Sequence, residues 1–120
     1  MNKESLKKRG QDAAAAYLER IGTCVVDRDW ACAVGRIDIV TWDADTLVIV
    51  GVKTRQAGRQ GPSGVVSAAV ARRVKKLAEA YIQYADLEAV TWRYDRIDLL
   101  VISDDRALLR HYRDALNTPI

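Results

Sequence analysis

The stretch Val48 to Arg55, which reads VIVGVKTR, constrains the fold more than any other part of the chain. Its β-branched residues are typical of a buried strand, because such side chains pack well on a pleated surface. Gly51 interrupts this apolar run, and a charged residue follows at Lys53. Glycine weakens a strand because it leaves no side chain to pack. The stretch therefore predicts a buried strand in which positions 51 to 53 have a role other than packing in the core.

Neighbouring segments predict a sheet around this strand. Residues 35–42, which read GRIDIVTW, alternate between apolar and polar side chains in the manner of a strand. The turn at residues 43–45 should join them to residues 46–53 as an antiparallel hairpin. A first strand is expected at residues 23–30, and another at residues 92–103, whose buried part is LLVI.

Three segments predict helices: residues 4–21, residues 66–85 and residues 105–116. In the long middle helix, six residues share one apolar face: Val66, Val70, Val74, Leu77, Tyr81 and Ala85. Because this helix joins two strands, it predicts a parallel crossover. The order α-β-β-β-α-β-α is that of an α/β protein with a mixed sheet flanked by helices, as a single domain over residues 1–120.

Charge is distributed unevenly along the chain. The whole sequence carries a net charge of +3, yet no Asp or Glu lies between Thr46 and Ala78. Seven cations fall in that segment: Lys53, Arg55, Arg59, Arg72, Arg73, Lys75 and Lys76. A basic middle within an otherwise acidic chain predicts an anionic partner, although four of these residues could simply form the solvated face of a helix.

Other classes of protein fit the sequence less well. No apolar run approaches the roughly 20 residues of a membrane span, and the charged N-terminus does not resemble a signal peptide. We therefore expect a cytoplasmic protein without a membrane partner. Cys24 and Cys32 have neither zinc nor disulfide spacing, so two reduced and mostly buried thiols are expected. A Cys–His pair would require the fold to bring back His111.

Asp38 and Lys53 form a pattern of possible chemical importance. An Asp on one strand, followed on the next by a lysine two residues after an acidic position, is typical of metal-dependent phosphodiesterases. There the carboxylates hold Mg²⁺, and the lysine orients water or neutralises phosphate. The same pattern also fits Asp and Lys side chains that merely reach solvent at strand ends.

Several motifs in order resemble the YraN family of small bacterial proteins, which is related to the restriction-endonuclease-like, PD-(D/E)XK nuclease superfamily. They are GRIDIV, TLVIVGVKTR, a Gly-Pro loop, VARRVKKLAEAYI and RIDLLVI, and the likeness extends back to GQDAAAAYLERIG. The resemblance implies a restriction-endonuclease-like fold, with Asp38 as the strand aspartate and Lys53 as the catalytic-type lysine. It also places Arg96 and Asp98 in an Arg-aromatic-Asp motif, where Ile97 replaces the aromatic residue.

The chain departs from that family at the residues that would hold metal. Gln11, Arg36 and Gly51 each stand where such proteins usually have Glu, and Val70 stands where they have Lys. With Glu at positions 11, 36 and 51, a site that also contains Asp38 and Lys53 would have a net charge of −3. With the residues that this chain has there, the net charge is +1. A site at +1 repels a divalent cation and attracts phosphate directly. Alternatively, Arg36 and Lys53 pair with Asp38 as a structural ion network.

The sequence thus predicts a nucleic-acid-binding protein of nuclease-like fold that lacks efficient metal-dependent cleavage. Asp38 and Lys53, with Gln11, Arg36 and Gly51, would be the remnant of a catalytic site, and Asp38 would bind metal only weakly. The seven cations would contact DNA or RNA, and no cofactor is expected. Trp30, Trp42 and Trp92 could stack on bases, but packing is the more usual role of tryptophan in a small domain, so we name none of them as a site.

Two alternatives stay open. One is an active endonuclease that uses Mg²⁺ or Mn²⁺ with relocated ligands. The other is a protein-interaction or assembly module, with a homo-oligomer as one form. Whether the chain is an enzyme is therefore not decided by the sequence.

Overall fold

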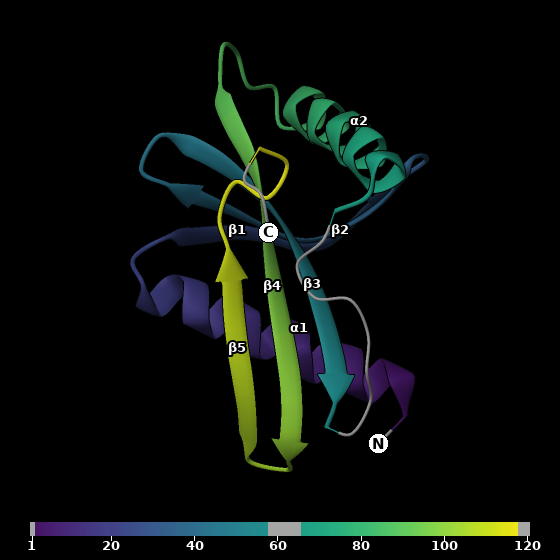
Figure 1. The fold of residues 1–120 in the computed structure, drawn as a ribbon. Helices are drawn as coiled ribbons and strands as arrows, with labels where there is room; N and C mark the ends of the chain where they lie inside the picture. The colour runs from purple at the N-terminus through teal and green to yellow at the C-terminus, as the bar shows by residue number, and fades with distance from the viewer. Residues whose placement is uncertain (1, 58–65, 118–120) are drawn as a thin grey trace.

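The computed structural model describes residues 2–57 and 66–117, which form a mixed sheet with two helices (Figure 1). The elements in chain order are α1 (Lys3–Arg20), β1 (Cys24–Cys32), β2 (Gly35–Asp43), β3 (Thr46–Gln56), α2 (Ala68–Tyr84), β4 (Thr91–Ser103) and β5 (Arg106–Tyr112). The strands lie in the order β1-β2-β3-β4-β5.

Strand β3 lies at the centre of the sheet. It pairs antiparallel with β2 and parallel with β4, and the outer pairs β1–β2 and β4–β5 are antiparallel. The predicted hairpin at residues 35–53 and the parallel crossover through the long helix are therefore confirmed. The α/β class is confirmed with them, because helices cover both faces of a mixed sheet.

The apolar run of β3 reflects burial on both faces. Leu47 and Ile49 pack with α2, whereas Val48 and Val50 pack with α1. All four side chains are at most 2% exposed, and burying each contributes roughly 1.5–3 kcal/mol relative to exposure. In Figure 1, α1 runs behind the strands and α2 lies over the upper part of the sheet, so β3, β4 and β5 extend below α2.

Local sequence fixes where the helices begin and end. The side chain of Asn2 accepts a hydrogen bond from the Ser5 amide at the start of α1, and Ser67 does the same for the Val70 amide at the start of α2. Gly22, with φ of 97°, follows α1 in the left-handed conformation that glycine adopts without strain. No helix of the described residues is long and apolar enough to cross a membrane.

The helix predicted at residues 105–116 is wrong, because Arg106–Tyr112 forms β5 instead. Leu108, Tyr112 and Ala115 have the spacing of a helical face, which is why the pattern misled. Strand β4 has 13 residues, and its outer edge would otherwise leave backbone amides and carbonyls without partners. A two-residue turn at residues 104–105 folds the chain back, and β5 pairs with that edge.

The cysteines are both free, as expected, but they are less buried than predicted. Cys24 is exposed and Cys32 is half-buried. Both lie at the ends of β1, which is an edge strand of the sheet. The ends of an edge strand are covered by few neighbours, so a thiol there keeps contact with solvent.

Candidate nucleic-acid interface

Gly51 is accounted for by the side chain of Tyr94. In the parallel register, Ile49 lies opposite Tyr94 and Gly51 lies opposite Arg96. A Cβ atom on Gly51 would collide with the Tyr94 hydroxyl and lie 3.0 Å from its Cζ atom. Tyr94 is buried, and burial raises the pKa of its phenol. A tyrosine side chain therefore fills the space into which a carboxylate at position 51 would project.

Asp38 has a structural partner at the point where β2 and β3 separate. The last paired residues of these two strands are Ile39 and Val50. Just beyond them, Oδ2 of Asp38 accepts a hydrogen bond of 2.8 Å from the Val52 amide. Burial raises the pKa of the Asp38 carboxyl, and this hydrogen bond offsets part of the rise. The carboxylate thus replaces the backbone acceptor that β2 no longer provides.

The ion network considered for Asp38 does not form in the described residues. Arg36 pairs with Asp29 instead, with 2.7 Å between Nη1 and Oδ1, and both side chains are about half exposed. Lys53 is exposed and forms no ion pair with any residue that the structure describes. Arg36 acts on Asp38 only through its charge, which lowers the pKa of that carboxyl.

Gln11 is buried on α1 and faces β1. Its Oε1 atom accepts a hydrogen bond of 3.2 Å from Nη2 of Arg28, which also pairs with Asp12. Within residues 2–57 and 66–117, no three or more His, Cys, Asp or Glu side chains are grouped as metal ligands would be. Of the positions carried over from the nuclease resemblance, Gln11, Arg36 and Asp38 therefore have protein partners, whereas Lys53 forms no ion pair among the described residues.

Lys53 and the Arg96–Asp98 motif lie on the face of the sheet that α2 covers. Strand alternation places Lys53 on the same face as Leu47, Ile49 and Gly51, and Asp98 lies opposite Lys53 on β4. Nε of Arg96 donates a hydrogen bond of 2.9 Å to Oδ1 of Asp98. Both side chains of this pair are largely buried, whereas the side chain of Lys53 is exposed.

Four predicted cations lie on the outer surface of α2. All are exposed, whereas Val74, Leu77 and Tyr81 of the same helix point into the core. No acidic residue occurs in the first turn of α2, where the helix dipole adds partial positive charge. Among the described residues, none of the four forms an ion pair; they are Arg72, Arg73, Lys75 and Lys76. Their charge is therefore available to an anion.

The two remaining predicted cations differ from these. Arg55 lies on β3, is half-buried and is not without an interaction partner. Arg59 lies outside the described residues. The surface that we call the basic face therefore consists of Lys53, Arg72, Arg73, Lys75 and Lys76.

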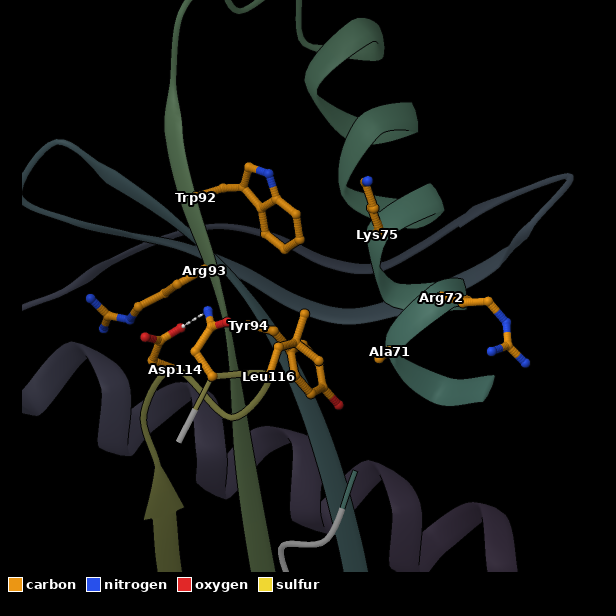
Figure 2. A pocket seen from close by; sticks show the side chains of 9 residues that line it. Ala71, Arg72, Lys75, Trp92, Arg93, Tyr94, Asp114 and Leu116 are labelled. Carbon is orange, nitrogen blue, oxygen red and sulfur yellow. Dashed lines mark hydrogen bonds between the residues drawn. The ribbon is translucent and has the colours of Figure 1, made fainter. Parts of the chain in front are cut away.

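A cavity of about 390 Å³ opens beside the basic face (Figure 2). Its walls come from α2, the start of β4 and the turn that follows β5, and its lining residues are Ala71, Arg72, Lys75, Trp92, Arg93, Tyr94, Asp114, Leu116 and Asn117. This cavity was not predicted from the sequence. The available signal was the pair Trp92 and Tyr94, two residues apart on one strand face and close to a basic helix.

A buried network around Asp95 was not predicted from the sequence either. Nε2 of His111 lies 2.7 Å from a carboxylate oxygen of Asp95, and Nε of Arg93 donates to the other at 2.9 Å. Nδ1 of His111 lies 2.9 Å from the Tyr17 hydroxyl. Burial alone would raise the pKa of Asp95, but hydrogen bonds from His111 and Arg93 hold it below its usual value. His111 therefore ties α1 to β4 and β5 and is no partner for a cysteine.

Comparison with known sequences gives consistent matches along the chain. The model of a family described as "Uncharacterised protein family UPF0102" matches residues 10–102. A UPF0102 protein of Arthrobacter sp. strain FB24 is 41% identical over 106 residues, which cover 88% of this chain and 87% of that protein. A UPF0102 protein of Geobacter sulfurreducens is 38% identical over 108 residues, covering 89% and 84% respectively. The chain therefore belongs to the UPF0102 family, which is the YraN family that its motifs resemble.

Proposed function

We propose that this protein binds nucleic acid through the basic face and does not cleave it efficiently with metal. The observation that carries the proposal is the set of exposed cations on α2, which no described acidic residue neutralises. Lys53 adds a further exposed cation on the same side of the sheet. Clustered cations without acidic partners favour phosphate, because each contact releases a counterion from the nucleic acid.

The space around Gly51 and Asp38 supports the second half of the proposal. Tyr94 fills the space into which a side chain at position 51 would project, and Asp38 accepts a hydrogen bond from the Val52 amide. Relocated ligands would have to come from other carboxylates. Asp98 is engaged by Arg96, and Asp95 is held by Arg93 and His111. With this arrangement, the restriction-endonuclease-like fold that the motifs imply would bind nucleic acid without holding a metal for cleavage.

Salt-dependent binding tests the first half of the proposal. Fluorescence anisotropy with a labelled oligonucleotide should give log K against log[salt] with a slope of about −3 to −5, as expected for roughly four to six phosphate contacts. The double variant Arg72→Ala with Lys76→Ala should weaken binding to every sequence about equally and flatten the slope by about 1 to 2.

A matched control comes from β5, where Arg106 and Arg110 are also exposed cations. Their replacement by alanine should change affinity much less than replacement of Arg72 and Lys76. Equal effects of the two pairs, or no binding near physiological salt, would refute the basic face as the interface. The assembly-module alternative would then be the better description.

A further inference from the structure

The cavity in Figure 2 has the size and lining of a small-molecule site. Its volume of about 390 Å³ lies at the lower end of the roughly 300–1,000 Å³ usual for such sites. A space of this size suits one nucleotide-sized group and not a length of duplex. The cavity is not lined by the positions that the nuclease resemblance assigned to a catalytic site, so that resemblance does not explain what the cavity binds.

Two aromatic side chains form one side of the cavity. Trp92 and Tyr94 alternate along β4 and therefore share a face of the sheet, and in Figure 2 the Trp92 ring extends toward α2. Trp92 is half-buried and has no aromatic partner among the described residues, whereas Trp30 contacts the rings of Tyr81 and Tyr84. Trp92 therefore lines the cavity without another aromatic ring against it, unlike Trp30.

The opposite side of the cavity carries positive charge. Lys75 and Arg72 are three residues apart on α2; in Figure 2 Lys75 lies across the cavity from Trp92, whereas the guanidinium of Arg72 points away from it. Both belong to the basic face. A lysine at such a position acts as a mobile point charge toward phosphate. An aromatic ring on one wall and a cation on the other match the two chemical parts of a nucleotide.

The third wall is fixed to the body of the sheet. The Ala115 amide donates a hydrogen bond of 2.7 Å to the Tyr94 carbonyl, and the Asp114 amide donates one of 3.0 Å to the buried carboxylate of Asp95. Asn117 donates from Nδ2 to Oδ1 of Asp114 at 3.0 Å. Because these bonds anchor the turn, the cavity exists before a ligand arrives, and binding need not order it. The Asn117 amide also brings a donor and an acceptor to the rim, which suits the edge of a base.

We propose that this cavity takes one unstacked nucleotide of a single strand, with its base on Trp92 and its phosphate on Lys75. The inference rests on the proposed nucleic-acid function and adds a preference for single-stranded or locally opened nucleic acid over intact duplex. In a duplex the bases are stacked on one another, so the aromatic wall could not reach a base face without opening the helix. Duplex would then bind through the basic face alone.

The test compares a single-stranded oligonucleotide with the blunt duplex of the same sequence. Trp92→Leu should weaken single-strand binding by roughly 5-fold to 100-fold, the usual range for loss of one base–aromatic stack. Its duplex affinity and its salt slope should stay close to those of the wild type. Tyr84→Leu is the matched control, because Tyr84 is 66% exposed on α2 and does not line the cavity.

Trp92 also contacts the core, so Trp92→Leu could weaken binding through a folding defect. A second variant distinguishes such a defect from loss of the cavity. Ala71→Leu would fill the cavity from α2 without removing any packed side chain, and leucine is a good helix former. It should reduce single-strand affinity like Trp92→Leu. As a direct readout, 2-aminopurine in the single strand should lose fluorescence on binding the wild type through stacking, and much less so with either variant.

The outcomes separate the two proposals. If the wild type binds with the expected salt slope but the Trp92 and Ala71 variants bind single strands as well as it does, the cavity proposal fails and the basic face stands. If the wild type prefers duplex, the cavity proposal also fails. If no nucleic acid binds at all, both proposals fail together.

Discussion

Replacing Gly51 with alanine should destabilise the protein, although alanine usually stabilises a strand relative to glycine. Gly51 does not have a positive φ, so its backbone accepts an L-residue and alanine should gain about 0.4–1 kcal/mol from the unfolded state. Against this, the new Cβ would meet the Tyr94 hydroxyl and lie 3.0 Å from Cζ. Overpacking of this kind costs about 1–3 kcal/mol, so Gly51→Ala should lower the free energy of unfolding by up to about 2.6 kcal/mol.

A double-mutant cycle isolates the cause. In a Tyr94→Ala background the clash is absent, so Gly51→Ala should be neutral or stabilising there, and the coupling energy between positions 51 and 94 should be about 1–3 kcal/mol. Urea unfolding followed by far-ultraviolet circular dichroism measures all four proteins. An equal effect of Gly51→Ala in both backgrounds would refute the packing argument.

The same geometry governs any attempt to rebuild a metal site. Gly51→Glu with Gln11→Glu and Arg36→Glu should not bind Mn²⁺ while Tyr94 is present, because the new carboxylate has no room. Adding Tyr94→Ala should let metal affinity appear in a calorimetric titration. If the quadruple variant folds and still ignores Mn²⁺, positions 11, 36, 38 and 51 do not converge on a metal site.

Three further predictions concern the carboxylates and the metal. Because the pKa of Asp95 is lowered, its network stabilises the fold above the unfolded-state pKa of about 3.9, and this stability is lost as pH falls through the folded-state pKa. Asp95→Ala should therefore lower the free energy of unfolding by about 3–5 kcal/mol at neutral pH, measured by urea unfolding, and should reduce that acid dependence. The contribution of Asp38 to stability depends on pH with the opposite sign. Its raised pKa opposes folding at neutral pH, and this penalty fades as pH falls toward about 3.9. Asp38→Asn keeps an oxygen for the Val52 amide and should therefore be nearly neutral at pH 7, whereas Asp38→Ala should cost about 1–3 kcal/mol. Finally, the wild type should not cleave DNA or RNA with Mg²⁺ or Mn²⁺ in a gel assay, and cation-dependent cleavage abolished by Asp38→Ala would contradict this.

The sequence by itself determined the elements whose signal is local. The apolar run at residues 47–50 predicts a strand with both faces covered, and α1 and α2 lie over those two faces. The hairpin, the crossover helix and the separation of α2 into a core face and a basic face follow from periodicity and turn residues near one another in the chain. These features need no knowledge of distant residues, since a few neighbouring side chains set them.

Only the tertiary structure decided the features that join distant residues. Strand β5 replaces a predicted helix because the edge of β4 needs hydrogen-bond partners, and helical spacing carries no information about that edge. His111 meets Tyr17, 94 residues away, and Tyr94 fills the space above Gly51 through a parallel register that no local pattern encodes. The cavity beside Trp92 likewise needs α2, β4 and the final turn together. Local side chains set each element's conformation, but the register and packing between elements set what each side chain meets.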